Sequence, residues 1–137
     1  MGPTQEGGLE RHADVLVFGT GAAGLTAALV AAIEGLDVAL FEKSAFAGGT
    51  TATSGGSLWV PGAAPILQAT PDVDVERARR YLLTELGPWV RQDLLEAFLD
   101  ASPEAIDYLS RHSEVRFAHA TNPDYHADQP FGSATGH

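Results

Sequence analysis

A glycine-rich turn between an apolar strand and an alanine-rich helix is the feature that most constrains this chain. Residues 14–18 (DVLVF) form a short apolar run that predicts a strand buried on both faces, as in a parallel sheet. The glycines of residues 19–24 follow, and residues 25–34 are good helix formers without proline, so they predict a helix. Another apolar run, residues 36–42, predicts the next strand. This order is that of a βαβ unit.

The spacing of Gly19, Gly21 and Gly24 indicates dinucleotide binding. The first glycine permits a tight turn, the second leaves room for a pyrophosphate beside the backbone, and the third lets the helix pack closely on the strand. We expect the amides of Ala22 and Ala23 to face the phosphates, because the positive end of the helix dipole favours negative charge there.

Glu42 ends the second predicted strand about twenty residues after the turn. A carboxylate at this place accepts hydrogen bonds from a ribose diol. Lys43 follows it and is compatible with a contact on the adenosine side of the ligand. These residues do not distinguish a nicotinamide cofactor from FAD, since both use this arrangement.

The charge and the composition exclude several classes of function. With 8 Lys plus Arg against 18 Asp plus Glu, the net charge is -10, so we expect binding neither to nucleic acid nor to anionic membrane surfaces. The chain has no Cys, hence no disulfide, thiolate metal site or cysteine nucleophile. His112, His119 and His126 do not predict a metal site either, because Asn122-Pro123 breaks any helix that would align them.

No targeting or membrane segment is expected. Residues 1–12 are polar and lack the basic and apolar regions of a signal peptide, so we interpret them as a leader. The longest purely apolar run, residues 27–33, is too short to span a bilayer. Together with the absence of Cys, these features indicate a cytoplasmic protein.

The remainder of the chain is predominantly helical by its hydrophobic pattern. Ser102 and Pro103 predict a helix start, as N-cap and first helical residue, and Trp89 is expected to be a core side chain. The predicted elements are helices over residues 72–86, 90–99 and 102–110 and a short strand over residues 115–117.

The predicted fold class is α/β, with a Rossmann-like βαβ unit followed by a helical segment. A doubly wound nucleotide domain usually has about five or six strands, whereas only two are predicted here, and two parallel strands are not stable alone. Either the chain is an N-terminal fragment, or a second, larger polypeptide completes the sheet, and we expect the second polypeptide. The expected organisation is a leader (residues 1–12), a dinucleotide-binding unit (residues 13–65) and a helical segment with an active-site loop (residues 66–137).

A second glycine cluster, residues 48–61 (GGTTATSGGSLWVP), helps to choose between a nicotinamide cofactor and FAD. Paired glycines let a backbone lie flat against a planar ring system, and small hydroxyls suit pyrophosphate and ribityl oxygens. The cluster resembles the flavin loop of the fumarate reductase and 3-ketosteroid dehydrogenase flavoprotein superfamily, most of all its 3-ketosteroid Δ1-dehydrogenase branch. The resemblance includes residues 15–43 and implies FAD, with loop contacts from Gly48, Gly49, Thr50, Thr51, Ser54, Gly55 and Gly56. Gly49 stands where members that link flavin covalently have a histidine, which implies non-covalent FAD.

The resemblance resumes at residues 122–126 (NPDYH), which are similar to the Pro-Asp-Tyr segment of the family. It implies that Tyr125 lies beside the flavin and assists a second tyrosine that acts as general base. The implied reaction is α,β-desaturation of a cyclic ketone, either a 3-ketosteroid or a smaller alicyclic ketone such as a cyclohexanone. The main base of the family comes from later polypeptide, so we expect activity only with a complementary polypeptide.

Two other functions stay open. A fumarate-reductase-like flavoenzyme acting on an unsaturated acid would share the same cofactor loop. A nucleotide-binding subunit without chemistry would share the glycine turn alone.

Overall fold

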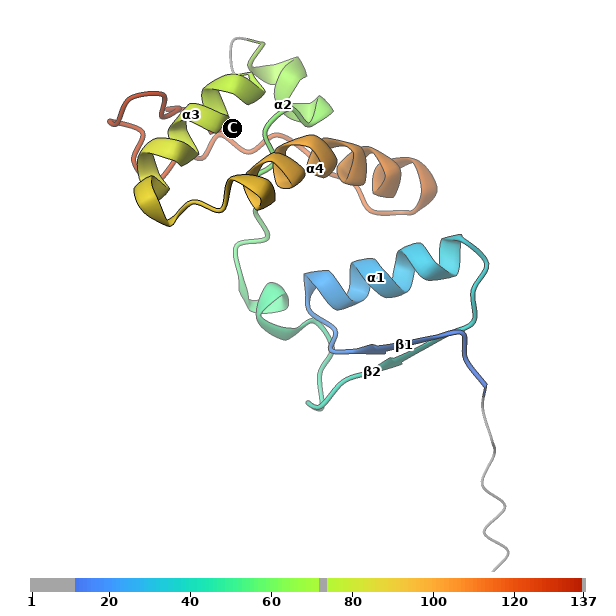
Figure 1. Cartoon of the computed structure of the whole chain (residues 1–137). Coiled ribbons are helices and arrows are strands. Elements are labelled where there is room, and N and C mark those ends of the chain that lie inside the picture. Colours follow the sequence, from blue (N-terminus) through green and yellow to red (C-terminus); the bar gives the residue numbers. More distant parts are fainter. Residues whose placement is uncertain (1–11, 72–73, 137) are drawn as a thin grey trace, which may run out of the picture. The chain divides into compact units, whose positions relative to one another are not determined.

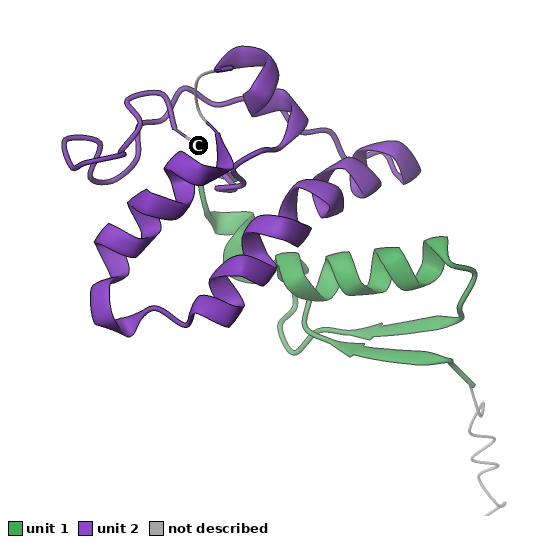
Figure 2. Cartoon of the chain, turned by 45° about the horizontal axis from the view of Figure 1, so that its top comes forward, with its two compact units in different colours: residues 1–56 green, residues 57–137 purple. Residues whose placement is uncertain are grey.

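The computed structural model describes residues 12–71 and 74–136 and divides the chain into two compact units, one ending at Gly56 and the other beginning at Ser57 (Figure 2). The described chain combines helices with a short parallel sheet. The predicted leader, residues 1–12, lies outside the described residues apart from His12.

The first unit is a strand, a helix and a strand in the predicted order. Strand β1 (Val15–Phe18) pairs in parallel with β2 (Val38–Phe41), with Val15 opposite Val38 and Phe18 opposite Phe41. Helix α1 (Ala22–Ile33) connects them and covers one face of the sheet (Figure 1).

Helix α1 ends in the way that glycine at position 35 predicts. Gly35 has φ +84° and its amide donates to the Ala32 carbonyl at 3.0 Å. The Leu36 amide donates to the Ala31 carbonyl at 3.1 Å. This pair of bonds is the Schellman motif, which satisfies carbonyls that a helix end leaves without intrahelical partners.

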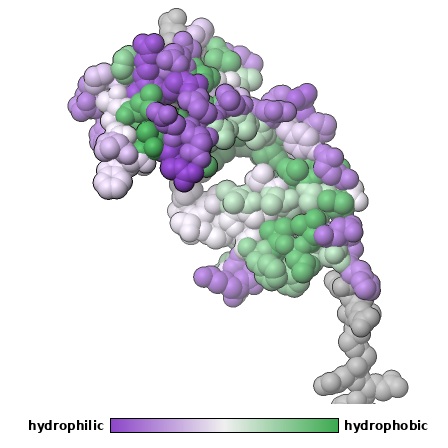
Figure 3. Space-filling view, viewed as in Figure 1, coloured by the Kyte–Doolittle hydropathy of each residue, from purple (hydrophilic) through white to green (hydrophobic). Residues whose placement is uncertain are grey.

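The sequence predicted that the strands of the first unit are buried on both faces, but in the structure several of their side chains are exposed. Leu16 is 59% exposed, Phe18 76% and Phe41 49%. The Phe18 and Phe41 rings stack with centroids 5.3 Å apart, and hydrophobic surface gathers over this unit (Figure 3). The prediction is wrong for these residues because, within the described part of the first unit, α1 packs on one face of the sheet and no element packs on the other.

The second unit consists of α2 (Ala64–Ala69), α3 (Val75–Leu86), the 3-10 turn η2 (Gly87–Trp89) and α4 (Gln92–His112). The helix predicted over residues 72–86 is confirmed as α3, which begins at Val75 and ends at Leu86, before Gly87. Asp74 caps it, because its Oδ1 accepts a hydrogen bond of 2.6 Å from the Arg77 amide. The short helix α2 was not predicted.

Helix α4 is one helix where the sequence predicted two. Pro103 lies inside it rather than at a first helical position. The buried side chains of the two predicted helices continue a single stripe, so ending the helix at Ser102 would break one packed face into two. The residues of this stripe are Leu95, Leu99, Ile106 and Leu109.

Two further predictions about the second unit are wrong. Residues 115–117 are not a strand; there the Arg116 guanidinium folds back and donates to the carbonyls of Ser110 and Ser113 at 3.1 and 2.6 Å. Trp89 is 88% exposed rather than a core residue. Across the described residues, no helix has the length and apolar character needed to cross a bilayer.

We expect Leu99→Ala to lower the free energy of unfolding by about 2–5 kcal/mol, because Leu99 is 2% exposed and its truncation leaves a cavity. Leu94→Ala on the same helix is the control, since Leu94 is 60% exposed. Urea titration of both variants measures the difference. Equal losses would contradict the assignment of Leu99 to the core.

Candidate cofactor site

The glycine turn after β1 requires glycine at its first and last positions. Gly19 has φ +102°, and its amide donates to the Phe41 carbonyl at 2.7 Å, which joins the turn to β2. A Cβ atom at Gly24 would lie 2.0 Å from the Gly19 carbonyl oxygen. Helix α1 therefore approaches β1 more closely than any side chain at position 24 permits.

Thr20, within the same turn, joins three segments of the site. Its amide and its hydroxyl both donate to Glu42 Oε2, at 2.9 and 2.5 Å. Its hydroxyl oxygen accepts a hydrogen bond of 2.8 Å from the Gly48 amide. Thr20 is only 4% exposed, so these bonds are partly buried.

Glu42 is held as a carboxylate at the end of β2. Besides the two bonds from Thr20, its Oε1 accepts a hydrogen bond of 2.9 Å from the Ser44 amide. The Thr20 hydroxyl, followed by the Ser44 and Thr20 amides, lowers the pKa of Glu42 from 4.5 to about 2. A carboxylate has about four lone-pair sites, so Glu42 can still accept bonds from a ribose diol.

The second glycine cluster folds onto the turn. Gly48 has φ +114° and precedes the 3-10 turn η1 (Gly49–Thr53). A Cβ atom at Gly49 would lie 3.3 Å from the Gly21 Cα atom. Thr51 Oγ1 accepts a hydrogen bond of 3.0 Å from the Ala22 amide and thereby caps α1.

The start of α1 keeps donors for an anion. Within the described part of the chain, the amides of Gly21, Ala23 and Gly24 donate to no protein acceptor, whereas that of Ala22 is taken by Thr51. Helix N-termini of this kind bind phosphates. An open cavity of about 500 Å³ lies beside them, lined by Phe18, Gly19, Thr20, Gly21, Phe41, Glu42 and Lys43. These features fit a dinucleotide. The amides can bind its phosphates, the carboxylate can bind its ribose, and glycines stand where a Cβ atom would intrude.

The other predicted loop residues lie in or just after η1 and are exposed. Thr50 contributes its carbonyl oxygen to a bond of 3.0 Å from the Thr53 hydroxyl. The Ser54 hydroxyl donates to the Thr51 carbonyl at 2.8 Å and accepts from the Gly56 amide at 3.1 Å. Gly55 has no atom near the position that a Cβ would occupy.

Tyr125 belongs to the second unit, and its side chain is fully exposed, at 102%. It is therefore not a turn residue with a buried ring. The Tyr81 ring is buried instead, and burial raises the pKa of its phenol. In the described part of the chain, no three His, Cys, Asp or Glu side chains are grouped to hold a metal ion.

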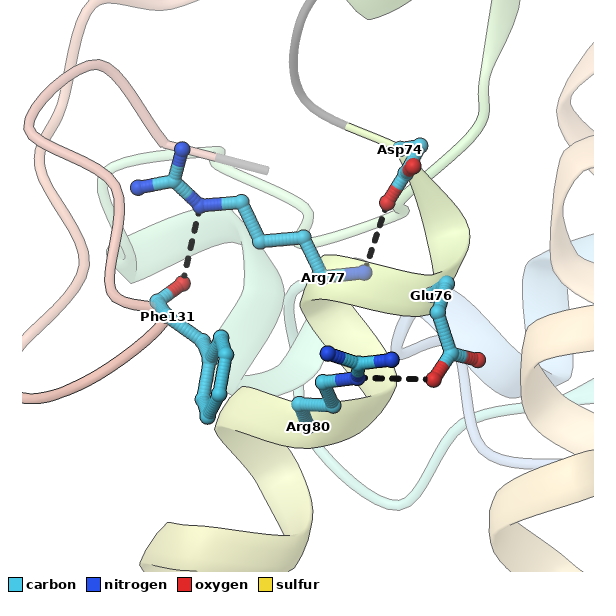
Figure 4. A pocket seen from close by; sticks show the side chains of 5 residues that line it. All are labelled: Asp74, Glu76, Arg77, Arg80 and Phe131. Atoms are coloured by element: carbon cyan, nitrogen blue, oxygen red, sulfur yellow. Dashed lines mark hydrogen bonds and ion pairs between the residues drawn. The ribbon is translucent and has the colours of Figure 1, made fainter.

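A second cavity, of about 420 Å³, lies on the second unit beside α3 (Figure 4). Arg77 Nε donates to the Phe131 carbonyl at 3.2 Å, and Arg80 Nε donates to Glu76 Oε1 at 2.9 Å. The Arg80 guanidinium also lies 5.6 Å from the centre of the Phe131 ring. Both arginines thus have protein partners and hold the loop around Phe131, which itself has φ +70°.

The sequence did not single out Thr20, Ser44 or Asp124, although each organises the residues around a predicted site. The available signal was their position, because Thr20 lies inside the glycine turn and Ser44 follows Glu42 by two residues. Asp124 directly precedes Tyr125, yet nothing in its neighbours marks it as buried.

The geometry of the first unit defines a dinucleotide-binding domain. Residues 14–137 match the family described as the FAD binding domain, and the chain belongs to this family. The predicted cofactor, FAD, and the predicted resemblance to 3-ketosteroid Δ1-dehydrogenases are confirmed.

Two relatives of the chain are dehydrogenases by name. It is 37% identical over 128 residues to a 3-oxosteroid 1-dehydrogenase of Mycolicibacterium smegmatis, a match that covers 90% of this chain and 22% of the relative. It is 43% identical to a 4-oxocyclohex-2-ene-1-carboxylate 5-dehydrogenase of Sinomonas cyclohexanicum, over 85% of this chain and 20% of the relative.

Among solved structures, the 3-ketosteroid Δ1-dehydrogenase of Sterolibacterium denitrificans in complex with 1,4-androstadiene-3,17-dione matches with a TM-score of 0.79 and 32% identity. The match covers 90% of this chain and 22% of that one. The chain thus spans about a fifth of the length of these relatives.

We expect Gly24→Ala to weaken FAD binding by at least about tenfold, because the new methyl group would displace the Gly19 carbonyl and with it the turn. Ala27→Ser, at an exposed position on the same helix, is the matched control. Equilibrium titration with FAD, followed by flavin fluorescence, measures both. An unchanged dissociation constant for Gly24→Ala would contradict the close approach.

We expect Glu42 to stabilise the fold in a pH-dependent manner. Its folded pKa of about 2 lies below the ordinary 4.5, so its stabilisation is complete above pH 4.5 and is lost as pH falls toward 2. Glu42→Gln removes the titrating group, so the difference in unfolding free energy between wild type and this variant should shrink over that window. Urea titrations at pH 7, 4.5 and 3 measure it. A constant difference would refute the lowered pKa.

Proposed function

We propose that this chain is the FAD-binding part of a flavin-dependent dehydrogenase that introduces an α,β double bond into a cyclic ketone. The observation that carries the proposal is the family match over residues 14–137, supported by a glycine turn and an ionised Glu42 arranged to receive a dinucleotide. The named relatives act on steroid or cyclohexene ketones, which favours this substrate class.

The chain's own residues would hold FAD at its pyrophosphate and at its ribose. The free amides of Gly21, Ala23 and Gly24 would bind the pyrophosphate, and Glu42 would accept bonds from the ribose. Lys43 lines the same cavity and would lie toward the adenosine. The residues of η1 and the glycines after it would contact the flavin side, through Gly48, Gly49, Thr50, Thr51, Ser54, Gly55 and Gly56. The resemblance to family members, in which a histidine at the position of Gly49 links FAD covalently, implies that FAD would bind here without a covalent bond.

The reaction separates a proton and a hydride from neighbouring carbons of the ketone. A base removes the proton next to the carbonyl, and hydrogen-bond donors stabilise the developing enolate oxygen. FAD held by these residues would supply the acceptor for the hydride from the adjacent carbon. A tyrosine with a pKa near ~10 needs help to act as a base at neutral pH. In this proposal Tyr125 supplies that help by a hydrogen bond to the base.

The base itself would come from a larger complementary polypeptide, which would also complete a Rossmann-like sheet. The uncovered apolar face of β1 and β2 supports this part of the proposal, since Leu16 and Phe18 are more than half exposed. In this arrangement residues 13–65 serve as the cofactor-binding domain, and residues 66–137 supply the helical segment with the active-site loop.

We expect the complete flavoprotein to be bleached, under anaerobic conditions, by 4-androstene-3,17-dione or by 4-oxocyclohex-2-ene-1-carboxylate. Loss of the oxidised flavin absorbance measures the hydride transfer. Succinate is the control for a fumarate-reductase-like enzyme and should leave the spectrum unchanged. Bleaching by succinate alone would overturn the proposal, and a colourless protein that binds no FAD would indicate a subunit without this chemistry.

A further inference from the structure

We infer that Asp124 is a positioning residue that holds Tyr125 in place through the Trp59 indole and the Ser133 amide. The inference rests on the proposed role of Tyr125 and adds the residues that orient it. All of these residues belong to the second unit.

Asp124 is a buried carboxylate with a donor on each oxygen. Trp59 Nε1 donates to its Oδ1 at 3.0 Å, and the Ser133 amide donates to its Oδ2 at 2.7 Å. The Asp124 amide in turn donates to the Ser133 carbonyl at 2.9 Å. Asp124 is 7% exposed, and a buried carboxylate is costly unless it is hydrogen-bonded, so these bonds act together to fix the backbone at this residue.

The residue after Tyr125 is anchored as well. The His126 amide donates to the Tyr81 hydroxyl at 3.3 Å, and the imidazole Nδ1 contacts a carboxylate oxygen of Glu85. Tyr81 is itself buried on α3. Both neighbours of Tyr125 are therefore attached to the helical unit, while its own ring points fully into solvent.

The partners of Asp124 are themselves fixed. The Trp59 ring stacks on Phe98 of α4 at 6.3 Å between centroids, with 10° between the ring planes. On the other side, Arg77 Nη2 donates to the Gly132 carbonyl at 2.6 Å, directly before Ser133. Asp124 thus connects the packed face of α4 to a loop that α3 holds.

An exposed tyrosine ring between two anchored residues is unusual for a loop with a purely structural role. A tyrosine at the surface normally buries its ring and exposes its hydroxyl, yet here the anchored residues are the ones before and after it. Trp59 also lies in the second glycine cluster, three residues after Gly56, so one hydrogen bond ties the end of that cluster to the residue before Tyr125. A small misplacement of such a side chain can lower a reaction rate about 100-fold.

The test is a double-mutant cycle in the complete, active flavoprotein. Asp124→Asn and Trp59→Phe each remove part of the anchor, and Tyr125→Phe removes the hydroxyl that it positions. Asp128→Asn is the matched control, the same substitution at an exposed position of the same loop. The measurements are the rate constant of anaerobic flavin reduction by the ketone that bleaches the wild type, the dissociation constant of FAD, and the melting temperature.

We expect Asp124→Asn and Trp59→Phe to slow flavin reduction about 10- to 100-fold with FAD affinity unchanged, and Asp128→Asn to have no effect. In the Tyr125→Phe background, Asp124→Asn should cause no further loss, because a positioning residue acts through the group it positions. If Asp124→Asn does not fold, Trp59→Phe takes its place in the cycle.

Equal losses in the wild-type and Tyr125→Phe backgrounds would overturn the inference and leave the role of Tyr125 intact. An unaltered rate for Tyr125→Phe would instead refute the role of Tyr125, and the inference with it. Bleaching by the ketone in that same variant would still support the proposed reaction, so the failures can be told apart.

Discussion

The hydrogen bonds of one buried hydroxyl hold the cofactor site together. Thr20 donates to Glu42 and accepts from Gly48, so the glycine turn, the end of β2 and the start of the second glycine cluster meet at its side chain. The glycine turn and the residues after β2 have no regular pairing, and backbone of this kind needs such partners to keep one conformation. The same bonds keep Glu42 ionised, so geometry and charge at the site have a common origin.

The first unit could be predicted well because its determinants are local. A parallel βαβ unit needs two apolar runs, a glycine where α1 meets β1, and a helix stop, and each is visible in residues 14–42. The burial of the strands could not be predicted, since it depends on what covers the second face. The role of Thr20 could not be predicted for a similar reason. A threonine in a turn carries no sequence pattern that indicates hydrogen bonds to Glu42 and Gly48.

The second unit was harder to predict because tertiary packing overrides local signals there. Ser102-Pro103 is a common way to begin a helix, yet α4 continues through it, since Leu99 and Ile106 share one buried face. Trp89, which follows Pro88, shows the opposite error. The sequence predicted a core side chain, but Trp89 is exposed because no described element covers it. The burial of Asp124 depends on Trp59, far away in sequence, and such a pairing cannot be deduced from either residue alone.

The two units also have different roles in the proposed enzyme. Among the described residues, the polar contacts around the cavity of the first unit lie within residues 14–56, so the proposed phosphate and ribose end of the site is encoded in one continuous segment. The proposed chemistry depends on a different kind of order, in which an exposed phenol is held by the residues on either side of it. A carboxylate serves both purposes: Glu42 accepts hydrogen bonds from a turn and shapes the candidate ligand site, and Asp124 accepts hydrogen bonds from the Trp59 indole and the Ser133 amide beside Tyr125. Carboxylates suit both because each oxygen accepts more than one bond, so a single side chain can join segments that share no secondary structure.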